Sequence, residues 1–379
     1  MGFGLTEEQE MLRSALRDFS AREVAPIAAE YDDRDEFPMH LWTKLGDLGF
    51  LGIGFPEAYG GSGGGFQEVQ IAGEELAYAS FGIALSIFAH TSLACRPILQ
   101  LGTQAQQRRY LPDALRGLKI GAWGLTEPDA GSDVAGLKTR AVRQGDHWIL
   151  NGSKMFCTNG NICNFVVAAA RTDPDAGMKG ISLFIVDRGT PGLHVSRKLK
   201  KISCKASDTA EVVFTDCKVP ADALLGPPGS GFIEALKTLE GGRVIAVGAA
   251  LGIARAAMDT AMKYARERMA FGQSIGKFQA IQFKFADMAT EIEAARCLGQ
   301  KVAWLADSGL PCAKEASMSK LFSSEMCKRV VNEALQVFGG YGLMMEFDVQ
   351  RYWRDAKLLE IGEGTSEIQR GIIAKHLGL

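Results

Sequence analysis

Residues 361–370 read Ile361-Gly362-Glu363-Gly364-Thr365-Ser366-Glu367-Ile368-Gln369-Arg370 and place one carboxylate between two glycines. Because glycine has no β-carbon, this peptide can form a tight corner between two helices and let a ligand approach its backbone. Glu363 is therefore the candidate catalytic base. The alternative is a plain helix junction, in which Thr365 or Ser366 caps the last helix and Glu363 lies in solvent.

A second stretch, far upstream, reads Trp123-Gly124-Leu125-Thr126-Glu127-Pro128-Asp129-Ala130-Gly131-Ser132-Asp133-Val134. Together the two stretches resemble the acyl-CoA dehydrogenases, in particular their short- and medium-chain branch. Further pieces in the order and spacing of that family are Pro56-Glu57-Ala58-Tyr59-Gly60-Gly61, Asn151-Gly152-Ser153-Lys154, Arg268-Met269-Ala270-Phe271-Gly272 and Gln336-Val337-Phe338-Gly339-Gly340-Tyr341-Gly342. Each piece is weak alone, but their common order is hard to assign to chance. The resemblance covers essentially the whole chain.

The hydrophobic pattern changes twice along the chain. Residues 1–117 and 229–379 show long helical periodicity, whereas residues 118–228 contain short apolar runs separated by turn residues. The expected strands include 148–150, 165–167, 181–186 and 211–214. The middle pattern predicts an antiparallel β domain, as a barrel or a sandwich. The resemblance implies an α+β fold with an N-terminal helical domain, a middle antiparallel β-barrel domain and a C-terminal four-helix bundle.

Composition is that of a soluble globular enzyme, with 379 residues, 47% hydrophobic and 23% charged residues. This length predicts two or three domains. A net charge of -2 without blocks of like charge argues against nucleic-acid binding and against a polybasic membrane patch. The eight cysteines form no C-x-x-C pair and the five histidines no metal-ligand spacing, so we expect a reducing compartment and no metal.

The N-terminus matches a myristoylation pattern at residues 1–6, but residues 6–9 favour a capping box that opens an amphipathic helix. No secretory signal is visible, and the longest apolar run, residues 244–254, is shorter than the roughly 20 residues that span a bilayer. Gly248 and Gly252 within that run predict close packing of a buried helix. We expect a cytoplasmic protein without membrane insertion.

The reaction that the resemblance implies is the α,β-desaturation of an acyl-CoA thioester. A base must remove the α proton, and a redox cofactor must accept the β hydride because no side chain can do so. In the family the cofactor is FAD and electrons pass to an electron-transfer flavoprotein; the enzymes are usually homotetramers. Glu363 matches the family's base, whose pKa desolvation would raise, and its N–H matches one donor to the thioester oxygen. Another branch carries its base at the position of Gly242, which cannot serve.

The resemblance assigns the binding residues position by position. Substrate contacts are expected from Ser132, Glu240, Arg243 and Gly364. Cofactor contacts are expected from Trp123, Leu125, Thr126, Gly131, Ser132, Phe156, Cys157, Thr158, Arg268, Phe271, Gln279, Gln336, Gly339, Gly340, Thr365 and Glu367, some of them from a neighbouring subunit. Each has a plainer alternative: the aromatic residues could be core residues, Arg268 a solvated helix-end cation, and Arg243 half of an ion pair.

Three positions depart from the usual family pattern. Gly362 stands where many straight-chain members have tyrosine, so branched, cyclic or otherwise bulky acyl groups become candidates, in addition to the short and medium groups that the resemblance to that branch implies. Glu240 replaces an aspartate, and Phe156 replaces a frequent tryptophan. Two other functions stay open: an enzyme on the same scaffold that acts on a carrier-protein thioester or uses oxygen, and a catalytically silent flavin-binding partner protein.

Overall fold

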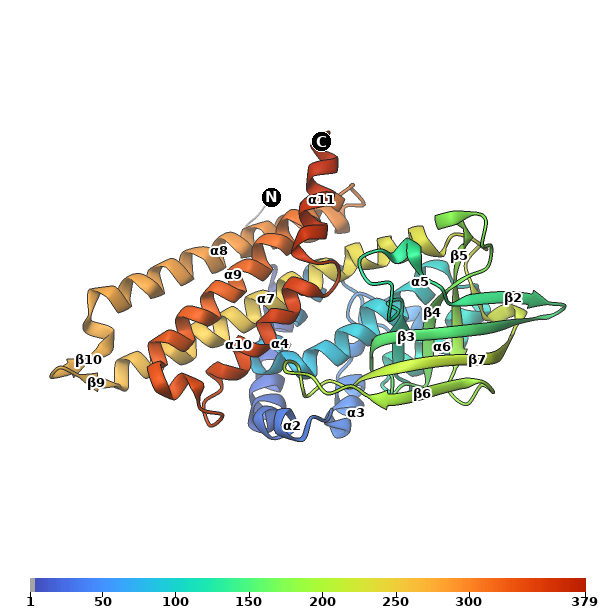
Figure 1. Ribbon diagram of the computed structural model, residues 1–379. Coiled ribbons are helices and arrows are strands. Elements are labelled where there is room, and N and C mark those ends of the chain that lie inside the picture. Colours follow the sequence, from blue (N-terminus) through green and yellow to red (C-terminus); the bar gives the residue numbers. More distant parts are fainter. Residues whose placement is uncertain (1–3) are drawn as a thin grey trace.

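The computed structural model of the protein describes residues 4–379, with a helical bundle at one end and a β-sheet at the other (Figure 1). Residues 1–3, which begin the myristoylation-like motif, lie outside the described residues. The predicted capping box is confirmed. Thr6 Oγ1 accepts a hydrogen bond from the Gln9 N–H at 3.2 Å, and Gln9 Oε1 accepts one from the Thr6 N–H at 3.1 Å.

Helices form the first part of the chain. They are α1 (Glu7–Phe19), α2 (Ala28–Arg34), α3 (Met39–Asp47), α4 (Phe66–Phe88), α5 (Arg96–Leu101) and α6 (Gln104–Leu115). Helix α4 packs against α7 (Gly231–Glu267), and two glycines of α7 bring the backbones together. A β-carbon at Gly248 would lie 2.4 Å from the Gln70 carbonyl oxygen, and one at Gly252 would lie 2.3 Å from that of Glu74. The close helix packing predicted from these glycines is confirmed.

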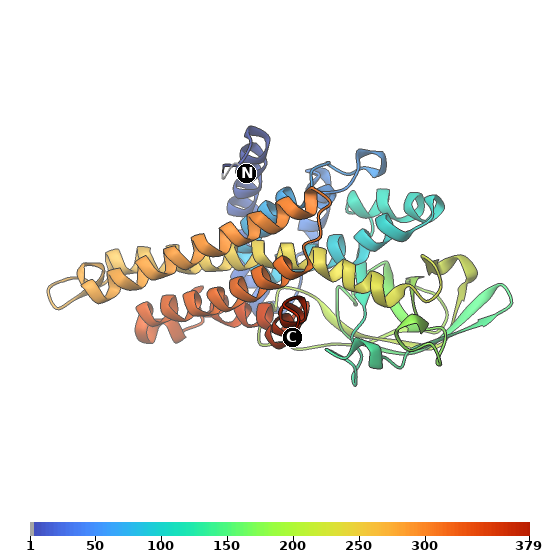
Figure 2. The ribbon, with the colours of Figure 1, turned by 90° about the horizontal axis from the view of Figure 1, so that it is seen from above.

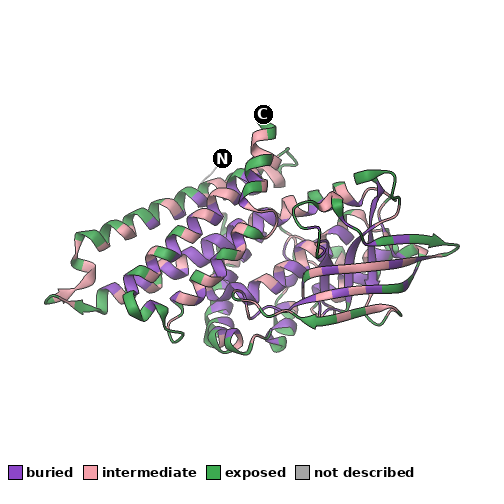
Figure 3. Ribbon diagram, viewed as in Figure 1, coloured by how far each residue is buried: buried purple, intermediate pink, exposed green. Residues whose placement is uncertain are grey.

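Two helical segments, Phe66–Leu101 and α7, are long and apolar enough to cross a membrane by length and composition alone. However, 78% and 72% of their most apolar windows are buried inside the protein. In Figure 3 the buried positions follow the interior of the bundle and the strands of the sheet. The two segments are therefore core helices, because their apolar faces are already covered by protein.

The middle part of the chain is a β-sheet. Its strands are β1 (Gly121–Gly124), β2 (Arg140–Gln144), β3 (His147–Thr158), β4 (Phe165–Arg171), β5 (Ile181–Asp187), β6 (Leu193–Lys198), β7 (Thr209–Pro220) and β8 (Leu224–Leu225). The strands expected from the apolar runs lie within β3, β4, β5 and β7, which confirms them. Strands β4 and β5 are buried almost throughout, so both of their faces are covered by protein.

The sheet differs from the predicted antiparallel barrel in two ways. Its order is β6-β7-β3-β2-β4-β5-β8, and among the described strands β6 and β8 do not pair to close a barrel. In addition, β1 pairs with β4 in parallel, and β2 meets β4 in parallel between Arg140 and Arg171. The parallel pairing arises because the chain leaves the sheet after β1 and returns only at β2. The excursion at residues 125–139 carries much of the second sequence stretch.

The C-terminal part is the expected four-helix bundle. It consists of α7, α8 (Gln279–Asp307), α9 (Ala313–Phe338) and α10 (Val349–Ile361), followed by α11 (Ser366–His376), and the short strands β9 (Met269–Ala270) and β10 (Gln273–Ser274) connect α7 to α8. Helix α9 packs against α7, α8, α10 and α11. Figure 2 shows α7 running from beside the sheet to the far tip of the bundle. The predicted order of helical, β and helical parts is confirmed.

Candidate active site

The corner that carries Glu363 joins α10 to α11, at the junction between bundle and sheet (Figures 1 and 2). Glu363 has a φ of 55° and Gly364 a φ of 92°, so two consecutive residues lie in the left-handed region. Thr365 is the N-cap of α11, and its hydroxyl accepts a hydrogen bond from the Ile368 N–H at 3.3 Å. The capping part of the helix-junction alternative is therefore correct, but its solvated carboxylate is not.

The Glu363 carboxylate points at α7. A β-carbon at Gly242 would lie 2.6 Å from Glu363 Oε1, so only glycine leaves room for the carboxylate there. Glu363 Oε2 is buried without a hydrogen-bond partner among the described residues. The position at which the resemblance puts the base of another branch thus faces Glu363 directly, and a side chain there would compete with the Glu363 carboxylate for one space.

Burial raises the pKa of Glu363 to about 7, and the cations of Lys320 and Arg243 partly oppose this rise. A carboxyl group with a pKa near neutrality is suited to general-base catalysis, since it is both ionised and basic at working pH. Arg243 is buried, with its Nε unpartnered and its Nη1 3.5 Å from Ser317 Oγ. Burial lowers the pKa of Arg243, while Glu363 and then Glu240 act to raise it. The structure therefore brings the predicted base together with Glu240, Arg243 and Gly364.

Two buried residues at this corner were not predicted from the sequence. Lys320 Nζ donates to the Gly364 carbonyl oxygen at 2.7 Å. Gln369 Nε2 donates to the carbonyl oxygens of Glu363 at 3.1 Å and Gly364 at 3.0 Å. Lys320 lies among the small polar residues Ser317, Ser319, Ser323 and Ser324 of α9, and this polar stretch in a helix of the bundle was the available signal.

The predicted cofactor residues of the β part lie beside one another at the end of β1. The Met155 N–H donates to the Thr126 carbonyl oxygen at 2.8 Å, which ties β3 to the segment that carries Trp123, Leu125 and Thr126. A register shift after Lys154 gives Phe156 a φ of 59°. Phe156 is 66% exposed and thus is not a core aromatic residue, whereas Trp123 is 9% exposed and packs in a core cluster.

The neighbours of Phe156 are more enclosed: Cys157 is buried and Thr158 is partly buried. Burial raises the pKa of the Cys157 thiol to about 12, which favours a packing role over a reactive one. Gly131 and Ser132 are exposed on the excursion after β1, and a β-carbon at Gly131 would meet no atom within 4 Å. This loop leaves open space in front of its backbone.

A buried ion pair holds the excursion against the sheet. Lys154 Nζ donates to Glu127 Oε1 at 2.6 Å and to the Leu125 carbonyl oxygen at 3.3 Å. The two oxygens of Glu127 also accept the backbone N–H groups of Lys138 and Thr139. Neither partner was assigned a role from the sequence, although both stand in the quoted stretches. A fully buried lysine needs such a partner, because an unpaired charge in the interior is costly.

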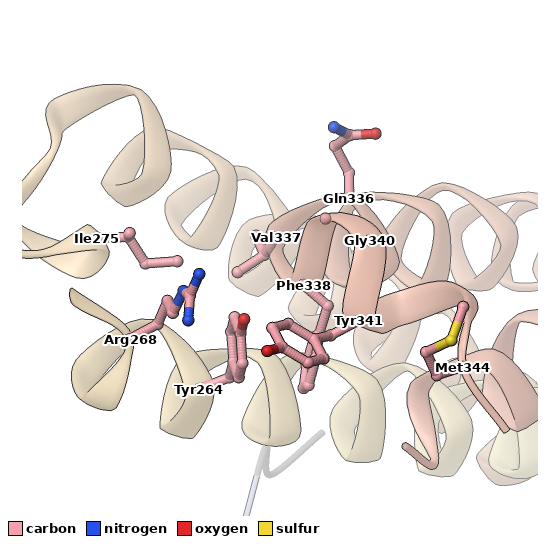
Figure 4. Close-up of a pocket in the computed structure, with 10 residues that line it drawn as sticks. Tyr264, Arg268, Ile275, Gln336, Val337, Phe338, Gly340, Tyr341 and Met344 are labelled. Carbon is pink, nitrogen blue, oxygen red and sulfur yellow. The ribbon is translucent and has the colours of Figure 1, made fainter. Parts of the chain in front are cut away.

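The remaining cofactor positions of the bundle lie at its far tip. Arg268, Gln336, Gly339 and Gly340 line a hollow of about 520 Å³, which is completed by Tyr264, Ile275, Val337, Phe338, Tyr341 and Met344 (Figure 4). Arg268 is the C-cap residue of α7 and is exposed, as the helix-end alternative expects, and its guanidinium also lies 5.5 Å from the centre of the Tyr341 ring. Phe271 is 94% exposed and Gln279 is exposed, and neither lines the hollow.

Glu367, in the first turn of α11, is exposed and lies at the α10–α11 corner, away from the residues that line the hollow. The hollow is also far from the corner. At ~1.5 Å of helix rise per residue, α7 separates Arg268 from Arg243 by roughly 37 Å. The structure therefore gathers the predicted residues into three places, at the α10–α11 corner, at the end of β1 and at the bundle tip.

Comparison with known proteins agrees with this architecture. Family models match in three consecutive pieces: "Acyl-CoA dehydrogenase, N-terminal domain" over residues 6–118, "middle domain" over 122–217 and "C-terminal domain" over 229–378. The "Probable acyl-CoA dehydrogenase YngJ" of Bacillus subtilis is 47% identical over 378 residues, which cover 100% of both chains.

Two solved structures superimpose along the whole chain. The butyryl-CoA dehydrogenase of Megasphaera elsdenii has a TM-score of 0.97 and 42% identity and covers 100% of both chains. A chain described under "Electron transferring flavoprotein of Acidaminococcus fermentans: Towards a mechanism of flavin-based electron bifurcation" has a TM-score of 0.98 and 43% identity, covering 100% of this chain and 99% of that one.

Fold and matches together define an oxidoreductase of the flavoprotein class. The chain belongs to the acyl-CoA dehydrogenase family, whose members depend on FAD. The residues present fit such a cofactor. Phe156 offers an exposed aromatic face beside β1, the backbone at Gly131 is open, and Arg268 supplies a cation at a hollow large enough for part of a nucleotide.

Proposed function

We propose that this protein catalyses the α,β-dehydrogenation of an acyl-CoA thioester, with Glu363 as the base that removes the α proton. FAD, when bound, supplies the acceptor for the β hydride. Glu240 and Arg243, both on α7, lie next to Glu363 and are proposed to contact the thioester end of the substrate. The remaining cofactor residues are proposed in the roles that the family resemblance gives them.

One observation carries this proposal most directly: the half-buried Glu363 has one fully buried carboxylate oxygen, Oε2, without a hydrogen-bond partner among the described residues, and its pKa is raised to about 7. An unpaired buried polar atom costs stability, and a substrate group that pairs with it would remove this cost. At neutral pH this side chain can accept a proton from a carbon acid that donors at the thioester oxygen make more acidic. The orphaned Nε of Arg243 beside it is a second polar atom that a substrate could satisfy.

The test is Glu363→Gln in the FAD-bound enzyme. The variant should keep the visible flavin spectrum and lose nearly all turnover, because a well-placed base contributes roughly 10²- to 10⁴-fold. Glu8→Gln, which removes an exposed carboxylate on α1, is the control and should turn over normally. Near-normal turnover of Glu363→Gln would refute the assignment of the base. Absence of flavin bleaching by any acyl-CoA under anaerobic conditions would refute the dehydrogenase function altogether.

For the acyl group, we propose a short or medium chain with tolerance for branches or rings next to the reacting carbons. A β-carbon at Gly362 would contact only Leu358, at 3.4 Å or more, and the φ of -65° there suits any residue. The space at Gly362 is thus open, and Gly362→Tyr should fill it without straining the backbone. The expected result is a fall in kcat/KM for branched and cyclic thioesters relative to straight ones. Equal relative values in both enzymes would contradict this specificity.

We further propose a cytoplasmic homotetramer that passes its electrons to an electron-transfer flavoprotein. The separation of the bundle-tip hollow from the α10–α11 corner supports an assembly in which one subunit completes the cofactor site of another. Light scattering should give the mass of four chains, and Arg268→Ala should weaken FAD binding although Arg268 is far from Glu363. Stopped-flow reoxidation by an electron-transfer flavoprotein or by oxygen distinguishes the two electron acceptors.

A further inference from the structure

Two side chains from different helices converge on the peptides that follow the candidate base. Lys320 of α9 and Gln369 of α11 supply three hydrogen bonds, of 2.7 to 3.1 Å, to the carbonyl oxygens of Glu363 and Gly364. Both side chains are buried, with exposed fractions of 1% and 0%. The contacts fix the orientation of two consecutive peptide groups at the one place where the chain turns from α10 into α11.

This turn is strained and needs such support. A non-glycine residue is energetically disfavoured in the left-handed region, and Glu363 has a φ of 55°. Strained backbone persists only where the surrounding structure determines it strongly. Because the side-chain direction follows the backbone, the same hydrogen bonds that hold this conformation also direct the Glu363 carboxylate toward Gly242.

Lys320 has little other reason to be buried. Among the described residues its ammonium makes one hydrogen bond, to Gly364, and no salt bridge. Burial lowers the pKa of Lys320 to about 8, while Glu363 acts to raise it, so the side chain is still cationic near pH 7. The charged groups that face the corner are Arg243 from α7, Glu360 from α10 and Glu367 from α11.

We propose that Lys320 and Gln369 are positioning residues for catalysis: together they lock the Glu363–Gly364 turn so that the carboxylate of Glu363 faces the substrate position, and the Lys320 cation favours the ionised form of that carboxylate. The proposal rests on the proposed function of Glu363 as the base. The neutral Gln369 contributes only to the positioning of the Glu363 carboxylate, whereas the cationic Lys320 contributes to both its positioning and its ionisation. The two contributions can therefore be separated by experiment.

The experiment uses the full-length, FAD-bound enzyme and an acyl-CoA that bleaches its flavin, and it measures kcat, KM and the pH profile of kcat/KM. Lys320→Met keeps the length and removes both donor and charge; Lys320→Arg keeps the charge; Gln369→Met removes the neutral donor. Lys314→Met is the control, since Lys314 lies on the same helix and is partly exposed. All variants are compared by flavin spectrum and melting temperature.

Lys320→Met should lose about tenfold or more in kcat with little change in KM, because small displacements of a catalytic group are costly. The acid limb of the kcat/KM profile reports the pKa of the base, Glu363. In Lys320→Met this limb should move to higher pH by on the order of one unit, because the variant lacks the nearby cation that favours the ionised carboxylate. Lys320→Arg should restore the acid limb. Gln369→Met should lose kcat while its acid limb stays in place.

A lower melting temperature of Lys320→Met with wild-type kcat and an unmoved acid limb would identify a merely structural lysine and overturn the proposal. Where that variant does not fold, Gln369→Met decides: a tenfold loss of kcat supports positioning, and wild-type kcat overturns it. Glu363→Gln, measured in parallel, separates the role of Glu363 as the base from the positioning role of Lys320 and Gln369. If it retains turnover, the proposed function fails; if it is inactive while the Lys320 and Gln369 variants are normal, only the positioning role fails.

Discussion

Replacing Glu363 by glutamine should make the protein more stable at alkaline pH, although it removes activity. The carboxyl has a pKa of about 7 in the folded protein against an ordinary value of 4.5. Below pH 4.5 the side chain is neutral in both the folded and the unfolded chain, so its ionisation costs nothing. As the pH rises above 4.5 the unfolded chain ionises while the folded protein keeps the carboxyl neutral, so stability is lost until the folded carboxyl also ionises near pH 7.

The size of this effect follows from the pKa difference. At about 1.4 kcal/mol per pH unit, the full cost above pH 7 is about 3 kcal/mol, and most of it develops between pH 5 and pH 8. Glutamine cannot ionise and escapes this cost. The free energy of unfolding of Glu363→Gln minus that of the wild type should therefore grow by about 2–3 kcal/mol from pH 5 to pH 8.

Urea unfolding at fixed protein and FAD concentrations measures this difference, because bound cofactor and subunit association also shift apparent stability. Glu367→Gln is the matched control in the same corner. The Glu367 carboxylate is exposed and its pKa is lowered, first by a backbone hydrogen bond, so its removal should bring no gain at high pH. A gap between Glu363→Gln and the wild type that is the same at pH 5 and pH 8 would refute the reasoning, since it would mean that the carboxylate ionises as easily in the folded protein as in water.

Three further changes test other parts of the structure. Gly242→Ala places a methyl group 2.6 Å from Glu363 Oε1 and should reduce kcat by at least about tenfold while the flavin stays bound, which steady-state kinetics and the absorbance spectrum would check. Lys154→Met leaves the buried Glu127 without its cation and should destabilise the protein by about 3–5 kcal/mol in urea unfolding. The double variant Lys154→Met/Glu127→Gln should recover part of that lost stability. No recovery would argue against a stabilising ion pair between the two residues. Gly248→Ala brings a methyl group to 2.4 Å from the Gln70 carbonyl oxygen and should lower the free energy of unfolding by about 1–3 kcal/mol. The control Gly371→Ala, whose methyl group meets no atom within 4 Å, should be neutral or stabilising by up to about 1 kcal/mol. Equal effects of the two variants on stability would contradict the close packing of α4 on α7.

Much of the architecture could be predicted from local patterns. Helical and strand periodicity, the Thr6–Gln9 capping box and the Gly248–Gly252 contact each depend on neighbouring residues, and all are confirmed. The parallel pairing of β1 with β4 could not be predicted in this way, because it joins segments separated by a hairpin and is decided by where the chain leaves the sheet. The pattern of apolar residues within a strand does not specify which other strand it pairs with.

The same distinction applies to the candidate site. Glu363 stands out because two glycines flank it in the sequence. Lys320 does not stand out, since its importance comes from the carbonyl oxygen of Gly364, which only the folded bundle brings to it. The wide separation of Arg268 from Arg243 depends on α7 being one helix from Gly231 to Glu267, which the structure shows and the order of the motifs alone does not.

A side chain at position 242 would occupy the space of the Glu363 carboxylate, and this limits how related enzymes can differ at the site. Two carboxylates this close together oppose each other's ionisation, so an enzyme with an acid at both positions would hold a shared proton and not two independent bases. The missing β-carbon at Gly242 thus leaves room for one proton acceptor only, on the corner between α10 and α11.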